Sequence, residues 1–279
     1  MIRCIASLLL LLLGTGTLTA QQRGLRVDRD VAIRMWLPAG DIEVRGWDRD
    51  SIDVRATSAA GSQFVGGGTA AAVKFAVEAK RPGDRALPAA RVVMSVPRTA
   101  RLWVKATTAV VTVSGLSGEL DVLQVDGRTM LRDVGGVVTV ESIDGSIALA
   151  RASGVMRIRS GAATVDLAGI TGSLDVSTVS GSVTWNGATI PATAIEARVV
   201  TVGGAVTLDG GLSPGSTLAI ETHDGDVHLQ LARDAATVVS ATGGTQRIAA
   251  ALADPRGKQS RITVRTFKGT VNAGVSSGI

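Results

Sequence analysis

The sequence predicts an all-β fold, specifically a β-solenoid: a β-roll-like stack of short strands preceded by an irregular β section. Glycine or alanine stands at every ninth position from Ala109 to Gly181, with no insertion. In each nine-residue unit, apolar residues at the third and fifth positions alternate with polar ones, as in a short strand with one buried face. Ser, Thr or Asp often precedes the glycine, a pair that favours a turn. Such units bury an apolar face only by stacking on one another.

The eighth position of the unit is also apolar in most repeats. Its column reads Leu116, Val125, Val134, Ile143, Ala152, Gly161, Ile170 and Val179. The unit is therefore G-x-Φ-x-Φ-x-x-Φ-[S/T/D], where Φ is apolar. Few rings are available to fill the core, because the chain has no Tyr, three Phe and four Trp. We expect a core of Val, Ile, Leu and Ala.

Charged residues indicate how many units make one coil, because equivalent residues of successive coils lie on adjacent strands. At a separation of 18 the sequence places opposite charges together, and at 27 it places Arg132 with Arg159. The pairs at 18 are Asp133 with Arg151, Glu141 with Arg159, and Arg157 with Asp175. Opposite pairs on adjacent strands are favourable and like pairs unfavourable. This favours two units per coil and a flattened solenoid of two sheets; a three-sided coil is the alternative.

The flanking regions are also rich in strand patterns. Short alternating runs before the repeat, such as 31–35 and 73–77, predict an N-terminal β section over residues 21–105 that caps the solenoid. Residues 106–279 are assigned to the solenoid, regular over 109–189 and looser over 190–279. No linker-like change of composition separates them, so we expect one continuous domain.

The N-terminus has the three parts of a secretion signal. Arg3 supplies the positive charge, Leu8 to Leu13 form the apolar stretch, and cleavage after Ala20 would leave Gln21 first. The apolar stretch is too short to span a bilayer, and no second one follows, so the mature chain, without residues 1–20, is expected to have no transmembrane segment. Cys4 is the only cysteine, which leaves the exported chain without disulfides or thiol chemistry. We expect a periplasmic, cell-surface or extracellular protein.

Composition also bears on partners and on order. Apolar residues make up 45% and charged residues 19%, which excludes a disordered chain. The formal net charge is +5, and its cations are scattered among acids with no basic run. Nucleic-acid binding needs a clustered basic patch, so we expect no nucleic-acid partner.

Several stretches resemble a known family. They are Gly40-Asp-Ile-Glu-Val-Arg-Gly-Trp-Asp followed by Ser51-Ile-Asp-Val, the serial S-G-x-Φ-x-Φ units such as 179–183, and the closing 266–271 segment. These residues resemble DUF4097, a bacterial family of unknown function described as adhesin-like proteins with β-solenoid-like repeats. The resemblance covers most of the mature chain. It implies an exported or surface-associated protein and supplies no catalytic residues.

Motifs that could carry chemistry fit simpler roles better. Segments 211–215 and 274–278 match G-x-S-x-G, but Pro214 has no N–H to donate to an oxyanion, and the second segment ends the chain. His223, Asp226 and His228 could be imagined as metal ligands, but strand residues five apart point to opposite faces. Asp126 and Asp144 precede glycine rather than follow it, unlike the aspartates of calcium-binding β-rolls. We expect no catalytic residue, no metal and no cofactor.

The four tryptophans are the remaining candidates for a binding site, as a carbohydrate platform. Trp185 stands in the fifth column, which predicts core packing, and Trp36 and Trp103 lie in the N-terminal section. Trp47 follows Gly46 in a predicted turn and is the best candidate for an exposed ring. Trp47 is therefore the single predicted ligand contact.

These observations predict an exported, non-enzymatic, adhesin-like β-repeat protein that acts as a structural or interaction module. Its partner would be an envelope protein or a polysaccharide. An alternative is an envelope sensor or regulatory partner that binds one signalling protein. A polysaccharide-cleaving solenoid enzyme would need a cluster of Asp, Lys or Arg on one face. The repeats instead carry mostly Ser, Thr and Val with dispersed charges, so this third option is disfavoured.

The export signal generates the first prediction. We expect the mature chain to begin at Gln21, because the pattern of Arg3, the leucine stretch and Ala20 directs cleavage there. Intact-mass measurement of the protein from the envelope fraction tests this. A mass that retains residues 1–20 would contradict it.

Overall fold

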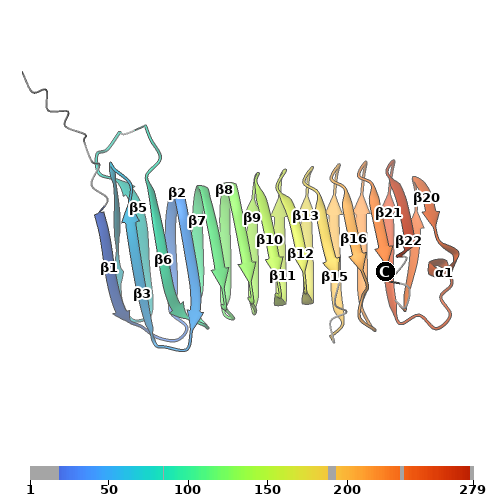
Figure 1. Cartoon of the computed structure of the whole chain (residues 1–279), viewed down its shortest axis with the longest axis horizontal. Coiled ribbons are helices and arrows are strands. Elements are labelled where there is room, and N and C mark those ends of the chain that lie inside the picture. Colours follow the sequence, from blue (N-terminus) through green and yellow to red (C-terminus); the bar gives the residue numbers. More distant parts are fainter. Residues whose placement is uncertain (1–18, 84, 188–192, 233–235, 277–279) are drawn as a thin grey trace, which may run out of the picture.

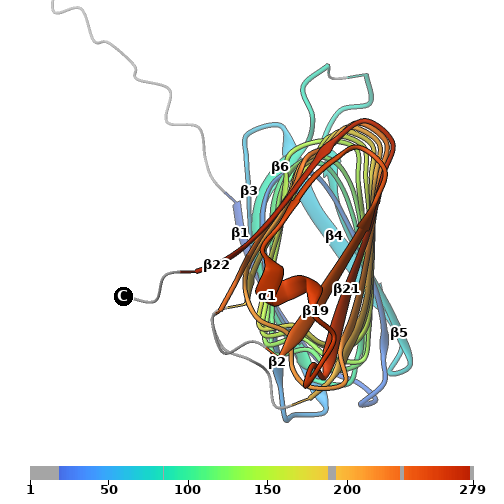
Figure 2. The same cartoon turned by 90° about the vertical axis from the view of Figure 1, so that its right-hand side faces the viewer.

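The computed structural model describes residues 19–83, 85–187, 193–232 and 236–276. These residues form an elongated stack of short strands (Figure 1). Viewed along the stack, the strands form the two long sides of a narrow, flattened ring (Figure 2). The predicted all-β solenoid is confirmed. Most of the predicted signal peptide, residues 1–18, lies outside the described residues.

Two sheets form the long sides. The first sheet contains, in spatial order, β4 (Ser62–Gly68), β5 (Ala72–Ala79), the first halves of β2 (Ala32–Trp47), β7 (Arg101–Ser114) and β8 (Glu119–Arg132), then β9 (Val137–Ser142), β11 (Ser153–Ser160), β13 (Thr171–Thr178), β15 (Ile195–Thr201), β17 (Thr217–Thr222), β21 (Ser260–Thr266) and β19 (Thr237–Thr242). The second sheet contains β1 (Thr19–Arg26), β3 (Ser51–Ser58), β6 (Ala89–Pro97), the second halves of β2, β7 and β8, then β10 (Ser146–Ala150), β12 (Thr164–Ala168), β14 (Val183–Gly187), β16 (Val206–Gly210), β18 (Val227–Leu231), β22 (Thr270–Val275) and β20 (Thr245–Ile248). A short helix, α1 (Ala250–Ala253), lies at the C-terminal end of the stack.

Successive coils stack in parallel at a separation of 18 residues. Ser146 pairs with Thr164, Ser153 with Thr171, and Arg101 with Glu119. The two-unit coil is therefore confirmed, and the three-sided alternative is wrong. Farther along, loop insertions lengthen the coils while the strands stay in register, so that Val183 pairs with Val206.

The charge pairs that predicted this spacing lie on adjacent coils. Asp133 and Arg151 form an ion pair at 2.6 Å, and Glu141 and Arg159 form one at 3.4 Å. Arg157 lies opposite Asp175 in the register of β11 and β13. The Arg151 guanidinium, by hydrogen bonding, lowers the pKa of the Asp133 carboxyl below its usual range.

At both ends of the stack the spatial order departs from the chain order. At the N-terminal end, β2 is followed in sequence by β3, β4, β5 and β6, which pair outside it, and the chain then returns to place β7 on its other side. At the C-terminal end, β21 lies between β17 and β19. In space, the coil that comes last in the sequence, β21 and β22, therefore lies between the β17–β18 coil and the β19–β20 coil. The β1–β3, β3–β6 and β4–β5 pairings are antiparallel.

The corner between each second-sheet strand and the next first-sheet strand, which we call the closed corner, buries its apolar residue. The residue that opens each turn has positive φ; these residues are Gly115, Asp133, Arg151 and Gly169. The residue after each of them points into the core; these residues are Leu116, Val134, Ala152 and Ile170. Half of the eighth column is therefore core.

The opposite corner, from the first sheet to the second, exposes its apolar residue, and we call it the open corner. From the β8 coil to the β21 coil a buried polar side chain precedes the turn, and in four coils it is a threonine whose hydroxyl accepts a hydrogen bond from a glycine N–H at 2.8 to 3.0 Å. The pairs are Thr178 with Gly181, Thr201 with Gly204, Thr222 with Gly225, and Thr266 with Gly269. Because the threonine points inward, the next residue points out. The other half of the eighth column lies here: Val125, Ile143 and Val179 are exposed, and Gly161 is half-buried.

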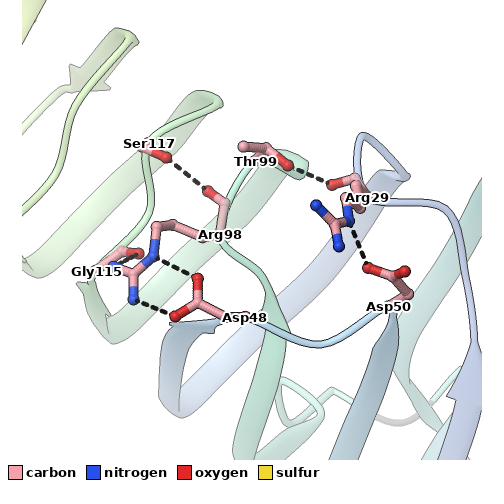
Figure 3. Close-up of polar contacts among 7 residues, drawn as sticks. All are labelled: Arg29, Asp48, Asp50, Arg98, Thr99, Gly115 and Ser117. Atoms are coloured by element: carbon pink, nitrogen blue, oxygen red, sulfur yellow. Dashed lines mark hydrogen bonds and ion pairs between the residues drawn. The ribbon is translucent and has the colours of Figure 1, made fainter.

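A polar network ties the N-terminal section to the first coils (Figure 3). The Arg98 side chain donates to the Asp48 carboxylate at 3.1 Å and to the Gly115 carbonyl at 3.2 Å. The same arginine lowers the pKa of the Asp48 carboxyl through the hydrogen bond and its charge. Arg29 pairs with Asp50 at 2.9 Å. These exposed pairs fix the turns relative to one another more than they stabilise the fold.

The stacking explains the glycine column. Gly154 has φ of +104°, and a Cβ atom built on it would lie 2.2 Å from the carbonyl oxygen of Gly136 in the coil below. A side chain here would therefore collide with backbone that is itself hydrogen-bonded. Gly203, in contrast, has no atom within 4 Å of such a Cβ.

We predict that Gly154→Ala destabilises the protein by about 2–4 kcal/mol, because it combines left-handed strain with overpacking. Gly203→Ala, the matched control, should change the free energy of unfolding by no more than about 0.5 kcal/mol. Urea denaturation of both variants tests this. Equal effects of the two substitutions would contradict the role assigned to close coil stacking.

Candidate functional site: a tryptophan groove on the first sheet

A groove of about 550 Å³ lies on the outer face of the first sheet, near the N-terminal end of the stack. It crosses β5, β2, β7, β8 and β9. Its floor includes residues that also face the core, such as Val104 and Val122, and its walls are outward-pointing side chains. Successive side chains of a strand point to opposite faces of the sheet, so the core-facing residues of the floor alternate with the outward-pointing residues of the walls.

Two rows of outward residues, set by the strand register, build the walls. The first row runs Lys74, Arg34, Trp103, Asp121 and Thr139. The second row runs Trp36, Lys105, Leu123 and Glu141. β2 and β7 are separated in sequence by the whole β3–β6 insertion, so only the fold brings Trp36 and Trp103 to one site.

The two indole rings have different environments. Trp36 is 46% exposed. Trp103 is half-buried, and the Arg34 guanidinium lies over its ring at 5.3 Å from the centroid. This cation–π contact holds Arg34 at the groove wall with its N–H groups available to a ligand. The exposed face of the Trp36 ring is an apolar surface on which a ligand in the groove can pack.

The groove continues along the sheet. A second hollow of about 340 Å³ shares Leu123 and Glu141 with it and extends across β11 to Ser177 on β13. Adjacent strands lie about 4.8 Å apart, so the combined track from β5 to β13 is roughly 30 Å long. Its shape suits an extended molecule.

The predicted ligand contact, Trp47, lies elsewhere. It ends β2 in the second-sheet half and pairs in register with Pro97. Its ring is half-buried, its Nε1–H donates to the Ser51 carbonyl at 2.8 Å, and Arg49 lies over it at 4.9 Å from the centroid. These contacts close the β2–β3 turn. Trp185 is buried, as its column predicts.

The other residues considered from the sequence have local roles. The Asp126 and Asp144 carboxylates accept hydrogen bonds from the N–H groups of Gly127 and Gly145 at 2.6 and 2.7 Å. Ser213 is buried. Nδ1 of His223 lies 2.9 Å from the Asp224 carboxylate, and His228 pairs in register with Asn272. Among the described residues, no three His, Cys, Asp or Glu side chains gather closely enough to hold a metal ion.

The open corner carries a second surface feature, a column of exposed apolar side chains. The column comprises Val125, Ile143, Val179, Val202 and Phe267. The Phe267 ring contacts the His223 ring at 5.0 Å between centroids. Over the part of the chain that the structure covers, no helix is long and apolar enough to cross a membrane.

Comparison of the chain with known proteins gave matches among solved structures. No family model matches it, and no curated protein matches it. Three solved structures are similar in outline. One is described as a "putative cell adhesion protein" from Clostridium sporogenes, with 7% identity and a TM-score of 0.32; it covers 93% of this chain and 100% of that one. Another is a "putative adhesin" from Bacteroides fragilis, with 11% identity, a TM-score of 0.36 and coverage of 93% and 99%.

The third is a "putative lipid binding protein" from Parabacteroides distasonis, with 11% identity, a TM-score of 0.37 and coverage of 91% and 97%. No conclusion about this chain rests on likenesses of this size. The DUF4097 resemblance stays a prediction.

Proposed function

We propose that the protein is an exported, non-enzymatic, adhesin-like binding module of the cell envelope, and that its partner is a polysaccharide held in the tryptophan groove. The observation that carries the proposal is the placement of Trp36 and Trp103 on adjacent strands, beside charged side chains of both signs. An aromatic face beside a few polar groups is the usual composition of a specific ligand site.

The shape of the site supports a polymer rather than a small metabolite. The groove and the hollow that continues it run along the sheet over several coils. A chain of sugars lying across the strands would contact outward-facing side chains of several coils, because the strand register sets these side chains in rows.

Local roles of the residues considered for catalysis support the non-enzymatic part of the proposal. Ser213 is buried and precedes Pro214, and His223 packs against Phe267 at the open corner. Export is supported by the N-terminal signal pattern and by the single cysteine, which lies inside that signal.

A second candidate is the regulatory partner protein that docks on one signalling protein of the envelope. The exposed apolar column of the open corner favours it, because exposed apolar side chains gathered on one side of the molecule, such as Val125 beside Ile143 and Val179 beside Val202, mark interaction surfaces. In that case, substitutions in the tryptophan groove would leave partner binding unchanged.

We predict that Trp36→Ala weakens polysaccharide binding at least about tenfold, as expected for a central aromatic contact. Trp47→Ala is the matched variant, because it removes the ring that the sequence favoured but the groove does not use. Binding to an immobilised panel of neutral and acidic polysaccharides, with thermal unfolding as a folding check, measures both.

The outcomes separate the two tryptophans. Loss with Trp36→Ala and retention with Trp47→Ala supports the groove. Loss with Trp47→Ala alone, in a folded variant, would restore Trp47 as the ligand contact. Failure of the unaltered protein to bind any polysaccharide of the panel would contradict the proposed function.

A further inference from the structure

The charges at the groove depart from the pattern on the rest of the first sheet. Elsewhere, neighbouring charges on adjacent strands have opposite signs, as in Arg157 opposite Asp175 in the register and the diagonal ion pair Arg198–Glu221 at 3.1 Å. At the groove, Lys74 of β5 is the register partner of Arg34 of β2. Two like charges directly opposite each other destabilise a sheet.

A third cation, Lys105 of β7, lies on the next strand, opposite Trp36. Arg34, Lys74 and Lys105 are all exposed, and within the described part of the chain none of them forms an ion pair. The three positions span two strand spacings, about 10 Å. They form a positive end of the groove, where no acid among the described residues makes an ion pair with them.

The acids of the groove lie at its other end. Glu141 is engaged by Arg159, which leaves Asp121 of β8, beside Trp103 in the register. A carboxylate in this position accepts hydrogen bonds from hydroxyl groups. The groove thus presents cationic donors and an aromatic surface together over β5, β2 and β7, and a hydroxyl acceptor on the next strand, β8.

We propose that the groove binds an acidic polysaccharide of the polyuronate type, whose carboxylates contact Arg34, Lys74 and Lys105 and whose sugar face packs on Trp36. This inference rests on the proposed function and names its ligand class. The bound carboxylates neutralise the facing cations Lys74 and Arg34, which supplies binding energy that a neutral polymer cannot supply. Arginine and lysine hydrogen bonds to carboxylates are stronger than those between neutral groups.

The experiment compares each acidic polymer with its own neutral form. Alginate and polygalacturonate are the acidic probes, and the carboxyl-reduced forms of the same polymers are the neutral ones. We expect the unaltered protein to bind at least one acidic probe about tenfold or more tightly than its reduced form. The affinity should fall as salt rises from 0.05 to 0.5 M, because salt screens exposed charges.

A matched pair of variants locates the effect. Lys74→Gln/Lys105→Gln removes two groove cations and leaves Arg34 in place over Trp103. Arg128→Gln/Arg247→Gln removes the same net charge from exposed positions on the second sheet. The first variant should lose about tenfold in affinity for the acidic probe, and the second should bind like the unaltered protein.

Each outcome decides the inference. Equal loss in both variants would mean attraction by net charge alone and would overturn it. Binding of the reduced polymers as tight as that of the acidic ones, and abolished by Trp36→Ala, would overturn the acidic ligand and leave the proposed function intact. Binding of no polymer in either form would overturn both.

Discussion

The structure depends on one constraint: successive coils lie in register at backbone contact, with residues i and i+18 on adjacent strands. At several glycines of the repeat this contact leaves no room for a Cβ atom. A Cβ on Gly145 would lie 2.0 Å from the carbonyl oxygen of Gly127, and Gly145 already has φ of +98°. The hydrogen-bonded ladders, the apolar columns and the corner turns all follow from keeping this register, because a shift by one residue would turn every side chain to the opposite face.

The same constraint makes the outer surface a set of rows. Each row contains one residue from every coil, so side chains of one kind at equivalent positions form a stripe along the surface. The first sheet carries neighbouring opposite charges, such as Glu141 with Arg159 and Arg198 with Glu221, and the open corner carries exposed apolar residues. At the N-terminal end the rows also receive residues from β2 and β5, which lie outside the nine-residue repeat. That irregular end is where two tryptophans and three unpaired cations meet.

The repeat itself could be predicted from the sequence, and pairing between distant segments could not. The nine-residue period, the buried third and fifth columns and the 18-residue coil can be predicted, because each produces a regular spacing of residue types along the sequence. No periodic pattern in the sequence indicates that β2 pairs with β7 across the β3–β6 insertion, or that β21 lies between β17 and β19. For this reason the sequence predicts Trp47, next to a recognisable turn, as the ligand contact, and does not indicate that Trp36 and Trp103 line one groove. The split of the eighth column has a signal in the sequence, because each open-corner member follows an uncharged polar residue, namely Gln124, Ser142, Ser160 or Thr178.

The most direct test of the two-unit coil compares two internal deletions by the midpoint of urea unfolding. Deleting residues 136–153 removes β9 and β10 as one whole coil, and every later strand keeps its sheet and its corner. Deleting residues 136–144 removes half a coil and moves every later strand to the other sheet, which places open-corner turns at the closed corner. Because solenoid stability is close to a sum over repeats and their interfaces, the larger deletion should have the higher midpoint. A higher midpoint for the nine-residue deletion would contradict the two-unit coil and the surface rows derived from it.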